Sequence, residues 1–193
     1  MKIVACTESA LAETAAVLLK GGVAVIPTDT VYGLAALPSC PSAVERLYTI
    51  KGRAAKKPIA LLAADAAAAE RFLGGAFPPR AASLAARHWP GALTLVLPLV
   101  GTPSAYEGLR VPDHDWTRRL LAACGGVLRV TSANLSGCRP ATDAPAALAD
   151  VGLSADIVVD DGVSPGGVAS TVARIDPSGS LTVLRAGGVV LDA

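Results

Sequence analysis

Residues 51–58 have the sequence KGRAAKKP, which gathers cations with no acid among them. The cations are Lys51, Arg53, Lys56 and Lys57. Gly52 and Pro58 disfavour a continuous helix, so we expect the cations on a loop or at the end of an element, where their heads can converge. Phosphate is the natural ligand of such a cluster. The competing interpretation is a solvated basic turn that binds nothing.

Two polar segments accompany this basic loop. Residues 28–30 (TDT) follow one predicted buried strand, and residues 131–134 (TSAN) follow another. Open α/β sheets place ligand-binding groups at the carboxyl ends of parallel strands, so we expect both segments to form one polar rim beside the cations. For each segment alone, ordinary turn chemistry is the alternative.

Composition narrows the class of protein. The chain has 193 residues, which predicts a single domain spanning 1–193. Its net charge is +1, so attraction for ATP or RNA must come from a local concentration of cations. Aromatic residues make up 4%, which leaves few platforms for stacking single-stranded bases.

The cysteines and the apolar segments argue against other classes. Four widely spaced cysteines without a C-x-x-C pair predict free buried thiols, and we expect no metal site and no disulfide scaffold: Cys6, Cys40, Cys124 and Cys138. The N-terminus lacks the apolar core of a signal peptide, and no apolar run approaches the length of a membrane span. We therefore expect a cytoplasmic protein, with neither membrane nor DNA as a partner.

Apolar periodicity and turn residues predict alternating strands and helices. Strands are expected at residues 3–5, 23–26, 59–63, 92–97, 108–112, 127–130, 157–159, 169–175 and 181–184. Helices are expected at residues 8–20, 41–50, 64–73, 79–88, 115–124 and from 142 or 143 to about 150. Pro98 is expected to stop the strand before it, and residues 177–179 to form a hairpin turn. The order indicates an α/β fold.

Six short motifs follow one another along the chain: PTDTVYGL (27–34), KGR (51–53), WPGALT (89–94), LRVPDH (109–114), SAN (132–134) and STV (170–172). In this order they resemble the YrdC-like family, the threonylcarbamoyl-AMP synthases, over nearly the whole chain. The resemblance implies a single α/β domain with a twisted, mostly mixed sheet flanked by helices and a positively charged concave surface. It also implies synthesis of L-threonylcarbamoyladenylate from L-threonine, bicarbonate or CO2, and ATP with release of pyrophosphate, the first step of tRNA threonylcarbamoyladenosine modification.

The resemblance also implies roles for individual residues. Threonine contacts are implied for Thr30, Arg110 and Ser170. ATP contacts are implied for Arg53, Lys57, Ser132, Asn134 and Arg185. Lys51 and Asn134 complete the K-x-R and S-x-N pairs, and Lys51 and Arg53 are the implied catalytic cations. Mg²⁺ is expected to carry part of the triphosphate charge, and tRNA and downstream tRNA-modification proteins are possible partners.

The chain departs from the longer two-domain members of this family at two positions. Leu62 stands where they have a histidine, and Pro140 stands where they have a serine. One threonine contact of that branch is therefore missing. The chain resembles the short single-domain branch.

The implied reaction needs positioning and charge neutralisation more than a nucleophile. Arg110 offers a bidentate fork for the substrate carboxylate, and we expect its charge to be paired with substrate. The rival explanation is a structural salt bridge with one of its nearest acids in the sequence, Glu107 or Asp113.

Two other functions stay open at this point. A non-catalytic module that binds double-stranded RNA or tRNA would use the same cations for phosphate contacts, and its affinity would fall steeply with salt. A YrdC-like paralogue with another carbamoyl-transfer role is the second alternative.

Overall fold

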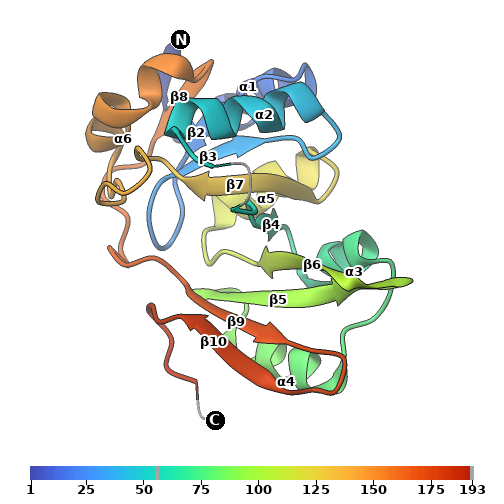
Figure 1. Cartoon of the computed structure of the whole chain (residues 1–193). Coiled ribbons are helices and arrows are strands. Elements are labelled where there is room, and N and C mark those ends of the chain that lie inside the picture. The colour runs from blue at the N-terminus through green and yellow to red at the C-terminus, as the bar shows by residue number, and fades with distance from the viewer. Residues whose placement is uncertain (55–56, 192–193) are drawn as a thin grey trace.

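A computed structural model of the chain describes residues 1–54 and 57–191 (Figure 1). Its strands form one mixed sheet in the order β1-β8-β2-β3-β7-β4-β6-β5-β9-β10. The strands are β1 Lys2–Ala5, β2 Ala24–Ile26, β3 Gly33–Ala36, β4 Leu61–Ala63, β5 Leu93–Leu99, β6 Thr102–Arg110, β7 Val127–Ser132, β8 Ile157–Asp160, β9 Thr171–Ile175 and β10 Leu181–Arg185. The predicted α/β class and mixed sheet are confirmed.

The helices begin and end close to the predicted residues because local caps define them. They are α1 Glu8–Leu19, α2 Pro41–Lys51, α3 Ala66–Leu73, α4 Pro79–His88, α5 Asp115–Ala123 and α6 Ala144–Asp150, with a short 3₁₀ turn at Gly152–Ser154. Thr7, Asp65, His114 and Asp143 each accept a backbone N–H of the first turn. Gly52, in the left-handed conformation, ends α2.

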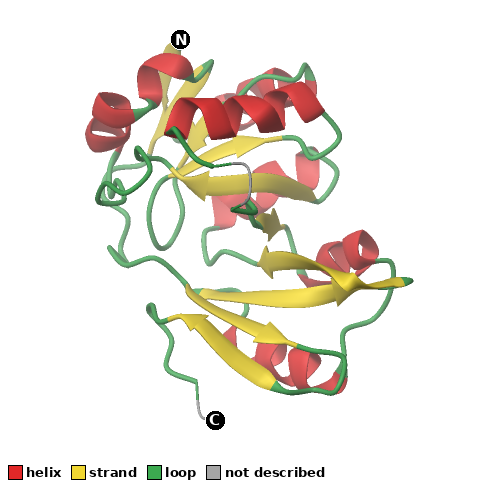
Figure 2. Ribbon diagram, in the orientation of Figure 1, coloured by secondary structure: helices red, strands yellow, loops and turns green. Residues whose placement is uncertain are grey.

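The helices cover the two parts of the sheet differently. Both faces are covered in the part of the sheet formed by β1, β8, β2, β3 and β7. Helices α1 and α5 pack on one face in one apolar cluster, and α2 and α6 pack on the other face in a second cluster. Around β6, β5 and β9, helices α3 and α4 pack on one face only. Figure 2 shows the opposite face of these strands free of helices. That bare face forms the floor of the site.

Strand direction confirms one expectation about the polar rim. β2 and β7 both pair antiparallel with β3, so they run in the same direction with β3 between them. Their polar carboxyl ends therefore lie at the same edge of the sheet, as predicted.

One strand, β3, was not predicted, and two strand boundaries were predicted wrongly. The sequence GLAA of β3 has weak strand propensity, yet all four residues are buried between β2 and β7, where pairing on both sides overrides propensity. β6 begins at Thr102 and not at Gly108, because β5 pairs with it as a long hairpin. Pro98 lies inside β5 and not at its end, since β9 pairs with β5 only as far as Val96.

No helix in the described part of the chain is long and apolar enough to cross a membrane. The cysteines in this part are free, as predicted. Cys124 is buried, whereas Cys138 is exposed, so the expectation of buried thiols was wrong for Cys138.

Candidate functional site

A cavity of about 510 Å³ lies over the bare face of the sheet. Because strand residues alternate, the odd members Leu93, Leu95 and Leu109 join the apolar core, while Thr94 and Arg110 face the cavity. Six predicted site residues line it: Thr30, Arg53, Arg110, Ser132, Ser170 and Arg185. They come from separate segments of the chain, and only the fold brings them together.

Arg110 lies at one end of this cavity, at the carboxyl end of β6, and is almost fully buried. Its Nη1 donates to Thr30 Oγ1 at 2.8 Å and its Nε to Gly91 O at 2.9 Å, while Nη2 pairs with the Asp29 carboxylate. Burial lowers the pKa of Arg110, and the negative charge of Asp29 opposes this shift. The expectation that Arg110 has no charged protein partner was wrong.

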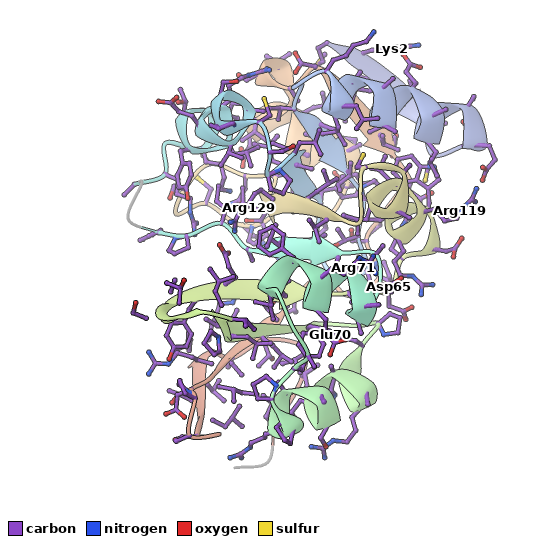
Figure 3. The ribbon with its side chains drawn as sticks, turned by 90° about the vertical axis from the view of Figure 1, so that its right-hand side faces the viewer. Lys2, Asp65, Glu70, Arg71, Arg119 and Arg129 are labelled. Atoms are coloured by element: carbon purple, nitrogen blue, oxygen red, sulfur yellow. The ribbon has the colours of Figure 1, made fainter. Side chains whose placement is uncertain are left out.

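The rival salt bridges proposed from sequence neighbours were also wrong. Glu107 pairs with Arg129 of β7, at 2.6 Å between Oε2 and Nη1, and Figure 3 labels Arg129 beside the sheet. Asp29 lies 81 residues away from Arg110 in the chain and reaches it only through the fold.

The turn that carries Asp29 and Thr30 is held by its own hydroxyl. Thr28 Oγ1 donates to Val31 O at 2.7 Å and accepts from the backbone N–H groups of Thr30 and Val31. This is the local side-chain capping typical of short turns. From outside the turn, Gly166 N donates to Asp29 O at 2.9 Å. Thr30 is thereby fixed with its hydroxyl against Arg110.

Ser170 connects Thr94 of β5 with Arg185 of β10. Its hydroxyl lies 2.8 Å from Thr94 Oγ1, and its carbonyl accepts from Arg185 Nη2 at 2.6 Å. Thr94 is buried, and it also lines the cavity. Sequence reasoning gave Thr94 no role, although it closes the quoted WPGALT motif; its alternation with Leu93 and Leu95 is the signal that marks it as facing the site.

Arg53 lies at the opposite wall and supports its own loop. Its Nε donates to Lys57 O and its Nη2 to Pro58 O, both at 3.0 Å. Burial, and secondarily the charge of Arg53, lower the pKa of Arg185. Both guanidinium groups line the same cavity, where they can act on one anion. Lys57 is exposed and does not line the cavity, and Lys56 lies outside the described residues.

Lys51 lies at the end of an element, one of the two predicted places, but its head does not line the cavity with Arg53. It is the last residue of α2 and is 2% exposed. Its Nζ donates to Ser132 O, to Asn134 O at 2.6 Å and to Asn134 Oδ1 at 3.3 Å. Burial, assisted by the charge of Arg53, lowers the pKa of Lys51 to about 8. Its contacts hold the segment after β7, with Ser132 at the cavity wall.

Asn134 is buried with Lys51 and does not line the cavity. Its Nδ2 donates to Leu135 O and Cys138 O, both at 2.8 Å. Each of the K-x-R and S-x-N pairs therefore has one buried member and one member that lines the cavity. The buried members, Lys51 and Asn134, contact each other, and Arg53 and Ser132 line the cavity.

The remaining lining residues define the character of the cavity. Leu62 and Pro140, the two positions where the chain departs from the longer members, are both in the wall. Among the described lining residues the charged ones are Arg53, Arg110 and Arg185, with no Asp or Glu. In the same described ranges no group of three His, Cys, Asp or Glu side chains is placed to hold a metal ion.

Proteins from other organisms have sequences similar to this one. A threonylcarbamoyl-AMP synthase of Bacillus subtilis is 38% identical over 84% of this chain and 49% of its own length. One from Idiomarina loihiensis is 34% identical over 86% of this chain and 92% of its own. The chain thus spans about half of the first relative but nearly all of the second.

Solved structures of similar proteins have the same fold as this chain. The crystal structure of Pyrococcus abyssi Sua5 complexed with L-threonine superposes with a TM-score of 0.89 at 31% identity, over 97% of this chain and 58% of that chain. Escherichia coli YciO, at 22% identity and a TM-score of 0.82, shares the fold. Residues 16–187 match the family Sua5_yciO_yrdC, described as "Telomere recombination". The chain therefore belongs to the Sua5/YciO/YrdC family.

Proposed function

We propose that this protein synthesises L-threonylcarbamoyladenylate from L-threonine, bicarbonate or CO2, and ATP, releasing pyrophosphate. The observation that carries the proposal is one cavity in which three arginines and several hydroxyl groups converge without a lining carboxylate. Relatives of comparable sequence are named threonylcarbamoyl-AMP synthases, and Sua5, which has the same fold, has been solved with L-threonine.

In this proposal the two ends of the cavity receive different substrates. Arg110, Thr30 and Ser170 hold threonine, with the arginine fork directed at its carboxylate. Arg53 and Arg185, with Ser132, hold the phosphates of ATP. Lys51 and Asn134 act indirectly, since they position the segment that carries Ser132.

The chemistry needs no nucleophile from the protein. The threonine amine adds to CO2 with loss of a proton, or condenses with bicarbonate with loss of water, to form a carbamate. A carbamate oxygen then attacks the α-phosphorus of ATP. The bond from that phosphorus to the bridging oxygen of pyrophosphate breaks, and pyrophosphate leaves with the electron pair. Arg53 and Arg185 neutralise the charge that moves onto pyrophosphate, and the common cavity keeps the reactants together.

Mg²⁺ has no proposed protein ligands. The described lining residues include no carboxylate, and no metal-binding cluster exists in the described part of the chain. The ion would enter with the triphosphate as part of the substrate. The product would pass to proteins that modify tRNA, and these, with tRNA, are the proposed partners.

The test is a pyrophosphate-release assay in which threonine, bicarbonate and ATP are omitted in turn. Release should require all three. Arg53→Ala should lower turnover by about 100-fold or more, and Arg53→Lys should also fail, because a point charge does not reproduce the planar fork. The matched control is Arg87→Ala, an exposed arginine of α4 that does not line the cavity.

Two results would contradict the proposal. Release that does not depend on threonine would leave an ATPase or a paralogue of different activity. Steeply salt-dependent RNA binding by a protein that releases no pyrophosphate would favour the RNA-binding alternative.

A further inference from the structure

The three arginines that line the cavity differ in how their charge is compensated. Arg110 has a buried carboxylate partner, Asp29; the two side chains are 7% and 12% exposed. Arg53 and Arg185 donate only to carbonyl and hydroxyl oxygens, and neither forms an ion pair with another described residue. The charge of Arg110 is thus compensated by a neighbouring carboxylate, whereas the charges of Arg53 and Arg185 are not.

The hydrogen bonds of Arg110 leave room for a ligand. A guanidinium group has five N–H donors, of which Arg110 spends three on Gly91 O, Thr30 Oγ1 and Asp29. One N–H on each terminal nitrogen remains available with respect to the described residues. This end can therefore donate two hydrogen bonds to a carboxylate without presenting a net positive charge.

Asp29 pairs with Arg110 but does not line the cavity. It is not among the residues that line the cavity, whereas its neighbours Thr28 and Thr30 are. Its backbone is held by Gly166, and its turn is held by Thr28. The carboxylate is thus anchored to neutralise Arg110 and does not itself face a ligand.

We propose that Asp29 is a specificity-determining residue that cancels the charge of Arg110, so that this end accepts a zwitterionic amino acid and excludes phosphates. The inference rests on the proposed function, because threonine and ATP would share the same cavity. An uncompensated Arg110 would attract the polyphosphate of ATP or the product pyrophosphate to the wrong end. Cancelling its charge leaves the pair Arg53 and Arg185 as the favoured polyanion site.

The first experiment measures threonine binding by calorimetry with and without inorganic pyrophosphate. In the wild type, pyrophosphate should change the threonine Kd by less than about twofold. In Asp29→Asn, which keeps the side-chain shape but frees the charge of Arg110, pyrophosphate should weaken threonine binding by about tenfold or more, the difference expected of one charged hydrogen-bonding group. Asp29→Glu should restore the wild-type pattern.

Glu107→Gln is the matched control. It frees Arg129, another half-buried arginine of the same sheet, which does not line the cavity. If Asp29 had only a structural role, pyrophosphate would affect threonine binding equally in Asp29→Asn and in Glu107→Gln. Competition between pyrophosphate and threonine that is the same in Asp29→Asn, Glu107→Gln and wild type would overturn the proposal.

A second variant keeps the test valid if Asp29→Asn does not fold. Asp29→Asn/Arg110→Gln buries no unpaired charge and replaces one neutral pair by another. It should lose threonine binding but keep its pyrophosphate Kd within about twofold of wild type. A fall in pyrophosphate affinity of about tenfold would show that the charge of Arg110 reaches the phosphates, and would overturn the inference.

The experiments distinguish failure of the proposed function from failure of this inference. A wild-type protein that neither binds threonine nor requires it for pyrophosphate release would remove the function and the inference together. A wild type that makes product normally, but whose Asp29→Asn variant shows no new competition, would remove the inference alone.

Discussion

Lys51 shows how a single buried cation can serve a site without lining it. Its ammonium group has four acceptors on Ser132, at the end of β7, and on Asn134, just after it; two of the four are backbone carbonyls. Buried carbonyl groups that lose their donor cost free energy, so the role of this lysine is measurable in stability as well as in activity.

Lys51→Met keeps most of the aliphatic stem and removes the donor. We expect the free energy of unfolding to fall by about 1–3 kcal/mol, because Ser132 O and Asn134 O lose their partner. Lys57→Met, at an exposed position of the same basic segment, should change it by less than about 0.5 kcal/mol. Urea unfolding of the two variants compares them. Equal free energies of unfolding in Lys51→Met and Lys57→Met would contradict the role of Lys51 as a buried hydrogen-bond donor.

The same lysine predicts a pH dependence. In the folded chain, burial and the charge of Arg53 lower the pKa of Lys51 from 10.5 to about 8. Between these values the unfolded chain binds more protons, so the contribution of Lys51 to stability rises as the pH increases from about 8 to 10.5. The difference in unfolding free energy between wild type and Lys51→Met should therefore grow across this window.

At the scale of elements, the segment between β8 and β9 joins the two parts of the sheet (Figure 1), and its last residues, Ala169 and Ser170, line the cavity. It is tied along its length: Tyr32 Oη donates to Gly162 O at 2.8 Å, His114 Nε2 lies 2.9 Å from Asp161 Oδ2, and Gly166 N donates to Asp29 O. Its backbone therefore helps to position the turn that carries Thr30.

Gly166→Ala tests this contact. An added Cβ would lie 2.6 Å from Asp29 O and 3.2 Å from Thr30 Cα, so the turn must shift. We expect a loss of about 1–3 kcal/mol in stability and a several-fold higher threonine KM, measured by urea unfolding and by pyrophosphate release. Gly188→Ala, whose Cβ would meet Ala92 Cβ at an ordinary 3.4 Å, is the control. An unchanged threonine KM in Gly166→Ala would separate this segment from the site.

At the scale of the whole molecule, β4 connects the two parts of the sheet. This three-residue strand pairs antiparallel with β7 on one side and parallel with β6 on the other. Leu61 of β4 is fully buried in the cluster that includes α3 and α4. The cavity spans this junction, so its geometry depends on the two parts folding together.

The two tryptophans test the predicted single domain. Trp116 packs in the cluster under α1 and α5, and Trp89 packs against the cluster under α3 and α4. In Trp89→Phe and in Trp116→Phe, the fluorescence of the remaining tryptophan and the circular dichroism should show one common urea midpoint. Leu61→Ala should lower the stability reported by both tryptophans by about 2–5 kcal/mol, whereas Leu153→Ala, at an exposed position, should not. Separate midpoints would reveal two independently folding units.

Most helices and the α/β class could be predicted from the sequence. Thr7, Asp143 and His114 cap helices within three residues of themselves, and apolar periodicity repeats within a turn or two. Such signals are local, so the chain alone carries them. The short motifs likewise contain Thr30, Arg53, Arg110, Ser132 and Ser170, and the family resemblance implied Arg185; all six line the cavity.

Only the tertiary structure decided which of these groups have partners. Asp29 meets Arg110, and Lys51 meets Asn134, across about 80 residues of chain, and β3 is a strand because two neighbours pair with it. Burial and charge compensation depend on what the fold brings near a side chain, which spacing in the sequence does not encode. For that reason the sequence by itself determined the residue types of the site, while the fold determined that Lys51 is buried behind its wall and that Arg110 is neutralised by Asp29.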